Sequence, residues 1–440
     1  MMLLETDVQT LEDLRIFGKR DRSGIFEIYN KTNTRGGENL LRDLFRQPLA
    51  DSKGIGERVA IIRYFASQDL HFPFDTALFD LCEKYIRNRR SAGIATAQGL
   101  GEKDIQNGVS AIIQLLNGLK MLMHSEFIIG ASAYAGERDT ICAILDEQVF
   151  APVFKDHKDG KVAFAAVAAY DLLFRTKIYA QIETLLSHIY LLDVYLAIAR
   201  IARERGFVFP QVHERGSRVL RIKGLYHPEL EKPVTNDVAM EGNLSLTLLT
   251  GANMAGKSTF LRSIGTAMYL AHMGFPVAAK SMDFAVMDGL YTTINLPDNL
   301  GIGASHFYAE VLRVKKVASE LGKGRSLFVI FDELFRGTNV KDAHEATVEV
   351  ARGFVAKDTS RFIISSHIVE AADQLSQIEG VAFWYLPTKM DGAQPVYTYT
   401  LEEGVTNDRH GMLIIQNEGI LDILKSGKKK IEASNLENII

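Results

Sequence analysis

The sequence predicts a multidomain protein in which a mainly helical core and lever part precedes an α/β part with a mostly parallel sheet. Three observations support this prediction. Apolar residues recur at alternating gaps of four and three over 178–199, which is typical of a long helix. Strand-like and helix-like patterns alternate over 217–424, as they do where crossover helices join parallel strands. A glycine-rich phosphate-binding pattern lies at 251–258, between a strand pattern and a helix pattern.

Bulk composition limits the function classes. The chain has 440 residues, which suggests two or three domains. Its net charge of −4 gives no general attraction to nucleic acid, so a DNA contact requires a local basic patch. The two cysteines have no metal-ligand spacing and fit a reducing cytoplasm. Because the first residues lack a signal-peptide pattern and no uncharged apolar run is long enough to span a bilayer, we expect a cytoplasmic protein with no membrane partner.

Residues 1–75 are predicted to form the N-terminal part of the core. Helical patterns occur at 10–17 and at 37–45, and the second must end before Pro48. Between them, 23–30 alternates apolar and polar residues, which predicts a strand.

Residues 76–216 are predicted to be a helical core and lever arm. Apolar residues at helical spacing predict one helix over 106–127. The longest pattern has the a/d register of a heptad, at Ile178, Ile182, Leu185, Ile189, Leu192, Leu196 and Ala199. It fits either a core helix of a bundle or an arm packed as a hairpin or coiled coil, and its length without internal breakers favours the arm. Gly206 suits the C-terminal end of that helix.

The phosphate-binding pattern G-x-x-x-x-G-K-[ST] is the most specific motif. Its glycines let the backbone turn so that successive N–H groups point at phosphate oxygens. Lys257 would reach the β- and γ-phosphates, and the Ser258 hydroxyl would hold Mg²⁺. A strand pattern at 244–250 and a helix pattern at 259–272 supply the required context, which argues against a chance match in a glycine-rich turn. The predicted nucleotide-binding residues are Gly251, Asn253, Met254, Ala255, Gly256, Lys257, Ser258 and Thr259.

A second acidic motif suggests hydrolysis of the bound nucleotide. The apolar strand pattern 327–331 ends in Asp332-Glu333, the arrangement called Walker B. Asp332 would help to hold Mg²⁺, and Glu333 would orient or polarise the attacking water. The alternative is an ordinary acidic strand end. The sequence therefore predicts ATP and Mg²⁺ as the nucleotide and the metal ion.

Two further segments are weaker candidates. His367 follows the strand pattern 361–366, where a side chain faces the ligand crevice of such sheets and could sense the γ-phosphate or the water. A histidine at a strand end without any such role is the equal alternative. The glycine-rich turn 301–306 precedes a helix, and its Ser305 would form an anion site for a nucleotide held by another subunit.

Together these motifs resemble the MutS DNA mismatch-repair ATPases. The P-loop carries that family's Asn-Met before its last glycine, and the residues after the Walker B strand follow its Asp-Glu-x-x-Arg-Gly-Thr pattern. Ser366-His367 corresponds to its Thr-His switch, with serine for threonine. The other matching segments are His227-Pro228, Asn236-Asp237, Asn30 to Gly37, Leu40 to Arg42 and Gln47 to Leu49.

The resemblance implies roles for single residues. Lys257 and Ser258 bind phosphate and metal, Asp332 completes the metal site, and Glu333 and His367 act on the water. It also implies ATP sites composed from two protomers, in a homodimer or a heterodimer with another MutS-type chain.

Two more residues take roles from the resemblance. Ser305 would contact the partner subunit's γ-phosphate, and Tyr399 falls near the position of an aromatic residue that stacks on adenine. The turn differs from the family's usual Arg-Ser-Thr, since Ala304 and His306 flank the serine.

Other departures concern the DNA-reading parts. The chain starts at the core, so the family's mismatch-recognition and connector domains are expected to be missing. The family's mismatch wedge is a Phe-x-Glu motif, and the spacing occurs here only in the Walker B strand, at 331–333. The arm is short for a full clamp, and no nuclease tail is expected after Ile440. The lysine-rich segment 425–440 is predicted to be a tail.

One basic cluster is a candidate DNA contact. Lys84, Arg87, Arg89 and Arg90 lie within seven residues, and such cations give salt-dependent, sequence-independent affinity for phosphates. The alternative is a solvated helix end.

The sequence thus predicts a dimeric ATPase that drives a DNA clamp in mismatch repair or recombination, on duplex or branched DNA, without wedge-type mismatch reading. The alternatives are an ABC-type ATPase without a DNA role and a nucleotide-dependent protein-interaction module.

Overall fold

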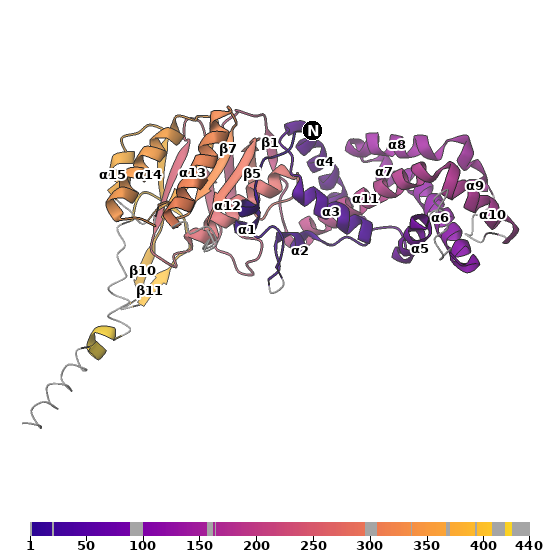
Figure 1. The fold of residues 1–440 in the computed structure, drawn as a ribbon, viewed down its shortest axis with the longest axis horizontal. Coiled ribbons are helices and arrows are strands. Elements are labelled where there is room, and N and C mark those ends of the chain that lie inside the picture. The colour runs from indigo at the N-terminus through magenta and orange to yellow at the C-terminus, as the bar shows by residue number, and fades with distance from the viewer. Residues whose placement is uncertain are drawn as a thin grey trace, which may run out of the picture.

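The computed structural model describes residues 2–19, 22–88, 100–155, 162, 164–294, 306–335, 337–366, 370–391, 394–406 and 419–424. Helices of the first half extend away from the strand-rich second half, and the helices from α5 to α10 lie farthest from the sheets (Figure 1). The predicted tail, 425–440, lies outside the described residues.

The described N-terminal residues form the helices α1 (Val8–Asp13), α2 (Ile25–Tyr29), α3 (Arg35–Arg46) and α4 (Ser52–Gln68). The helix predicted at 10–17 begins earlier, because the Asp7 side chain caps it by accepting from the backbone N–H of Thr10. It also ends earlier, and Arg15 has a left-handed φ of 49°. The helix predicted at 37–45 corresponds to α3.

The strand predicted at 23–30 is wrong, because this segment forms α2. A Glu27 carboxylate oxygen accepts from the backbone N–H of Gly24 at 2.7 Å, which caps the first turn. Ile25, Phe26 and Tyr29 are buried, and this spacing of one and four residues is helical. The segment is short, so its apolar residues fit a strand pattern by chance, while the buried side chains lie on one side of a helix turn.

The helical middle of the chain contains α5 (Thr76–Arg87), α6 (Glu102–Met123), α7 (Glu126–Ile129), η1 (Ser132–Tyr134), α8 (Ala135–Leu145), η2 (Gln148–Phe150), α9 (Ala151–Lys155), α10 (Phe164–Leu172), the π-helical turn η3 (Leu173–Lys177) and α11 (Tyr179–Arg205). Helix α11 packs against α8 and η3 as well as α3 and α4, so one helix contacts both the N-terminal helices and the helical middle of the chain. Gly206, with φ of 65°, ends it as expected. Helix α11 is long and apolar enough to cross a membrane, but 72% of its most apolar window is buried inside the protein.

Among the described residues, the strands of the second half form three sheets. Its strands are β1 (Gln211–His213), β2 (Leu220–Leu225), β3 (Asn236–Ala239), β4 (Leu246–Gly251), β5 (Ser281–Ala285), β6 (Gly289–Thr293), β7 (Leu327–Phe331), β8 (Arg361–Ser365), β9 (Val381–Leu386), β10 (Thr388–Asp391), β11 (Gln394–Tyr397) and β12 (Glu402–Glu403). The largest sheet has the order β12-β9-β4-β8-β7-β6, in which only β12 is antiparallel to its neighbour. A smaller sheet has the order β1-β5-β2-β3, and β10 pairs with β11 as a hairpin.

Helices cover both faces of the six-stranded sheet. These are α12 (Lys257–His272), α13 (His306–Gly322), α14 (Val340–Val355) and α15 (Glu370–Leu375). Alternate residues of β7 divide between two apolar clusters: Phe328 and Ile330 join the cluster that contains α12, and Val329 joins the cluster of α13, α14 and α15. The sheet is therefore buried on both faces, as its continuous apolar strands predict.

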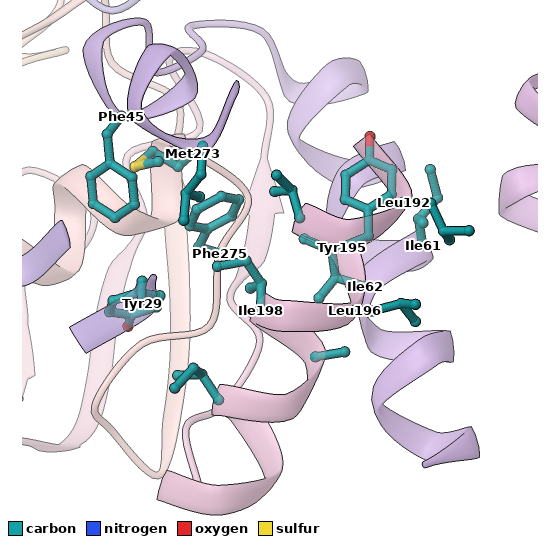
Figure 2. Packing of buried hydrophobic residues seen from close by; sticks show 14 of the residues in the cluster. Tyr29, Phe45, Ile61, Ile62, Leu192, Tyr195, Leu196, Ile198, Met273 and Phe275 are labelled. Atoms are coloured by element: carbon teal, nitrogen blue, oxygen red, sulfur yellow. The ribbon is translucent and has the colours of Figure 1, made fainter. Parts of the chain in front are cut away.

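The core of the helical part is continuous with the end of α12. Figure 2 shows Phe45 and Tyr29 beside Met273 and Phe275, and Ile198 of α11 next to them. The Tyr29 and Phe275 rings stack at 6.2 Å between centroids, and Phe45 meets Phe275 edge-on at 5.8 Å. The segment that follows α12 is thus packed against α2 and α3, with Ile198 of α11 beside it.

The first residues of the chain lie against the sheet edge. Glu5 forms a bridge with Gly289 of β6, and its backbone N–H donates to Asp288 at 2.8 Å. The Asp13 carboxylate accepts from the Thr292 hydroxyl and the Ile294 N–H, both at 2.8 Å. This segment therefore covers the backbone groups of the edge strand.

Candidate nucleotide site

The loop between β4 and α12, where the sequence predicts a phosphate cradle, contains three residues with positive φ. Gly251, Met254 and Gly256 have φ values of 151°, 71° and 99°. Left-handed conformations suit glycine, and they turn the chain sharply between the strand and the first turn of α12. The N-terminal end of α12 faces this loop, so its unpaired N–H groups favour an anion there.

Lys257 lies folded over the same loop. Its Nζ donates to the carbonyl oxygens of Gly251 at 2.8 Å and Ala252 at 3.1 Å. Burial lowers the pKa of Lys257, while the nearby carboxylates of Asp332 and Glu333 act in the opposite direction. The loop therefore holds an ammonium group at the position where the motif requires one.

The structure brings the two predicted motifs together. The Ser258 hydroxyl donates to Oδ2 of Asp332 at 2.6 Å. Strand β4 delivers the first motif and β7 the second, and β8 lies between them in the sheet. Because all three strands are parallel, their carboxyl ends meet at one edge.

Sequence reasoning missed the contacts of Ser365, the last residue of β8. Its hydroxyl donates to Oδ1 of Asp332 and accepts from the backbone N–H of Glu333, the latter at 3.0 Å. The available signal was a hydroxyl residue at the end of a buried strand, next to the histidine of the predicted switch.

Glu333 follows Asp332 with a φ of 54°, an uncommon value for a residue other than glycine. Strand β7 ends at Phe331, so this turn takes the chain out of the strand. Such backbone strain is often found at functional sites.

A pocket of about 310 Å³ adjoins the loop. The Tyr399 ring lies against Gly256, where an added Cβ would be 2.9 Å from the ring. Asn236 holds the tyrosine's segment, since its side-chain amide donates to the Tyr399 carbonyl at 3.0 Å and accepts from the Leu401 N–H at 2.6 Å. The other lining residues are Leu225, Tyr226, His227, Leu230, Lys232, Pro233, Val234, Ala255, Thr259, Phe260, Ser263 and Leu386.

His227, another residue missed as a site candidate, is a buried wall of this pocket. Burial lowers its pKa to about 4, and the neighbouring Arg15 and Arg262 act in the same direction. Within the part of the chain that the structure describes, its Nε2 has no hydrogen-bond partner. The imidazole is therefore neutral near pH 7.

The oxygen atoms of Ser258, in the first turn of α12, and of Asp332, after β7, fit a magnesium ion. Ser258 and Asp332 offer a hydroxyl and a carboxylate, the hard ligands that Mg²⁺ prefers. Over the described ranges, no group of three or more His, Cys, Asp or Glu side chains could form a metal site. Two protein ligands agree with the usual mode of Mg²⁺, which takes its other ligands from phosphates and water.

Comparisons with known proteins identify the family. The model of MutS domain III matches residues 9–233, and the model of MutS domain V matches 247–434. The chain belongs to the MutS family. Helices α2 to α11 lie within the first match, and both predicted nucleotide-site motifs lie within the second.

Curated relatives give the same result. The chain is 30% identical over 234 residues to the DNA mismatch repair protein MutS of Persephonella marina, which covers 52% of this chain and 26% of that protein. It is 29% identical over 243 residues to the DNA mismatch repair protein MutS of Aquifex pyrophilus, covering 54% and 28%. The matched part of the chain therefore spans about a quarter of the length of these relatives.

Several predicted site residues are not placed. Ser305 and His367 lie outside the described residues, as do Arg89 and Arg90. Their roles in this MutS family member stay predictions.

The rest of the basic cluster is on the surface and paired. Lys84 lies 3.0 Å from a carboxylate oxygen of Asp104, and Arg87 lies 2.7 Å from one of Glu83. These ion pairs are exposed, so each contributes little to stability, and a phosphate could compete for the cations. A DNA contact at this cluster also stays a prediction.

Proposed function

We propose that this MutS family protein is an ATP-dependent DNA-binding protein. It hydrolyses ATP at sites composed from two protomers and uses that cycle to drive a clamp on duplex or branched DNA, in mismatch repair or recombination. The observation that carries the proposal is the 2.6 Å hydrogen bond from Ser258 to Asp332, which joins the phosphate loop to the acidic strand end.

The proposed organisation has four parts. Residues 1–75 are the N-terminal part of the core, 76–216 the helical core and lever arm, 217–424 the P-loop ATPase domain, and 425–440 a tail. The proposed location is the cytoplasm.

In nucleotide binding, the backbone of the loop from Gly251 to Gly256 surrounds the phosphates, and Lys257 turns from the loop carbonyls toward them. Tyr399 provides an aromatic face for adenine in the pocket beside Gly256. Ser258 and Asp332 would hold Mg²⁺, which would neutralise charge on the phosphate oxygens.

In hydrolysis, water attacks the γ-phosphorus, and the bond to the oxygen that bridges the β- and γ-phosphates breaks. ADP leaves with that electron pair. Glu333 orients the water and accepts its proton, while Lys257 stabilises the negative charge on the phosphate oxygens. His367 would act on the same water, and Ser305 would contact the γ-phosphate held by the partner protomer.

Helix α12 offers a route from this site to the arm. It begins at Lys257, and its far end packs through Met273 and Phe275 on helices of the core and on α11 (Figure 2). Movement of the loop on nucleotide binding would therefore reach a helix that extends through the arm.

The central test is Glu333→Ala. The variant should bind ATP and Mg²⁺ like the wild type in calorimetry but lose turnover by roughly a hundredfold or more. Glu345→Ala is the matched control, since Glu345 is an exposed carboxylate on α14. Turnover that survives in Glu333→Ala would contradict its assigned role, and a wild-type chain that ignores ATP would end the proposal.

Composite sites are tested by mixing protomers. Ser305→Ala should inhibit hydrolysis when mixed with wild-type chain, whereas independent activity of each protomer would rule out shared sites. Binding to duplex, mismatched and branched DNA should be measured at several salt concentrations, with and without ATP. Absence of DNA affinity at low salt would favour a nucleotide-dependent interaction module instead.

A further inference from the structure

Ser365 lies at the meeting point of the two motifs, on the strand that separates them. We propose that Ser365 is a positioning residue that orients the Asp332 carboxylate and holds the backbone of Glu333 in the proposed ATPase site. This inference rests on the proposed function and deepens it, because it assigns the control of the metal-binding carboxylate to a residue outside both motifs.

The sheet fixes where the Ser365 hydroxyl can be. Ser365 pairs with Leu249 of β4, and the preceding residue, Ile364, pairs with Phe331 of β7. The next backbone N–H, of Ser366, donates to the Leu249 carbonyl at 3.0 Å. Ser365 is fully buried, so packing and ladder hydrogen bonds hold its backbone level with Asp332.

Each carboxylate oxygen of Asp332 accepts a hydrogen bond from a different serine. Ser365 donates to Oδ1, and Ser258 donates to Oδ2 at 2.6 Å. A carboxylate with a donor on each oxygen has little freedom to rotate, and these bonds to a charged group are stronger than neutral ones. Ser365 therefore turns Oδ2 toward the phosphate loop.

The same hydroxyl also acts on Glu333. A serine hydroxyl can donate one hydrogen bond and still accept another, and here it accepts from the Glu333 N–H at 3.0 Å. Glu333 has an uncommon φ of 54°, so this bond helps to hold the turn from which its side chain projects. One hydroxyl thus fixes the orientation of Asp332 and the backbone of Glu333.

The chain contains a matched control at the other end of the same strands. Ser360 is fully buried just before β8, and its hydroxyl accepts from the Leu327 N–H of β7 at 3.0 Å. Ser360→Ala removes an equivalent buried hydrogen bond between the same two strands, far from the phosphate loop. Any effect of Ser365→Ala that Ser360→Ala shares is structural.

The experiment compares Ser365→Ala, Ser365→Thr and Ser360→Ala in the full chain. A fluorescent ATP analogue is titrated at a series of Mg²⁺ concentrations and also in EDTA, and turnover is measured separately. Ser365→Ala should need about tenfold more Mg²⁺ for half-maximal stimulation of binding, with unchanged affinity in EDTA and kcat reduced about tenfold. Ser365→Thr, which keeps the hydroxyl, should restore the Mg²⁺ dependence, and Ser360→Ala should not change it.

An Mg²⁺ dependence and a kcat equal to those of Ser360→Ala would overturn the role of Ser365. If Ser365→Ala does not fold, Ser365→Cys, which keeps a side chain of similar shape but is a weak hydrogen-bonding partner, replaces it in the same comparison. A wild-type chain that binds no nucleotide would instead refute the proposed function, so the two failures are distinguishable.

Discussion

The guanidinium of Arg58 donates a hydrogen bond of 2.8 Å to the main-chain oxygen of Met273, which caps the C-terminal end of α12. Arg58 comes from α4 and also hydrogen-bonds Tyr195 of α11. A cation at a helix C-terminus is favourable because the last carbonyls carry partial negative charge. One buried side chain therefore joins the phosphate-loop helix to the long helix of the arm.

This junction predicts a loss of stability in Arg58→Ala. The substitution leaves the buried Met273 carbonyl without its charged donor, and the free energy of unfolding should fall by about 2–3 kcal/mol. Urea denaturation followed by circular dichroism measures it. Lys53→Ala, at an exposed cation on the same helix, should change it by less than about 0.5 kcal/mol. Equal effects of the two substitutions would contradict the junction.

His272 predicts a pH dependence of stability. Its Nε2 accepts from the Met287 N–H and its Nδ1 bonds the Met268 carbonyl, which fixes a neutral imidazole. Burial lowers its pKa from 6.5 to about 4. Between pH 6.5 and about pH 4 the unfolded chain binds a proton that the folded chain does not. The free energy of unfolding should therefore decrease by roughly 3 kcal/mol in total as the pH is lowered through this range.

Denaturation at pH values from 7.5 to 4 checks this prediction. His272→Gln should be less stable at pH 7 but should show a shallower decline, because one titrating group is gone. A slope unchanged from that of the wild type would show that His272 does not titrate as inferred.

A second pH dependence of stability is expected from Asp7, which is a paired, charged carboxylate and not a buried neutral imidazole. Its carboxylate pairs with Arg313, whose Nη2 lies 3.0 Å away, and with Lys316 at 2.6 Å. Although burial opposes the charged form, hydrogen bonds from Arg313 and Lys316 hold the pKa of Asp7 well below its usual value of 3.8. The pairing therefore stabilises the fold above about pH 4, and the stabilisation is lost as the pH falls below that value.

Asp7→Asn tests this pairing. It should lower the free energy of unfolding by about 2–3 kcal/mol at pH 7 and by much less at pH 2. Asp43→Asn on α3 is the control, because its pairing with Arg46 is exposed and contributes little. A loss in Asp7→Asn that does not depend on pH would contradict the ionic origin.

Two glycines predict opposite results on substitution by alanine. Gly256 has φ of 99° and contacts Tyr399, so Gly256→Ala should destabilise the protein by about 1–2 kcal/mol. Gly353 lies within α14 with no neighbour within 4 Å of an added Cβ, so Gly353→Ala should stabilise it by about 0.5–1 kcal/mol. Thermal denaturation measures the change in stability for each variant. A change of the same sign in Gly256→Ala and Gly353→Ala would contradict the prediction.

Much of the sheet could be predicted because its signals are local. Strand β7 has the predicted bounds, and β4 and β8 differ from their predicted ends by at most two residues. Continuous apolar runs that end in glycine, acidic or hydroxyl residues mark strands buried on both faces. The short segment 23–30 failed because five helical residues give too few positions to distinguish a period of two from one of 3.6.

By itself the sequence determined the residue types of the nucleotide site and the elements that carry them, because loop, strand and helix signals each depend on neighbours in the chain. Only the tertiary structure decided that β8 separates β4 from β7, and hence that Ser365 contacts Asp332 and Glu333. It likewise decided that Tyr399 lies on Gly256 and that Arg58 joins α12 to α11. Strand order and helix docking depend on side chains distant in sequence, and no local pattern encodes which of them will meet.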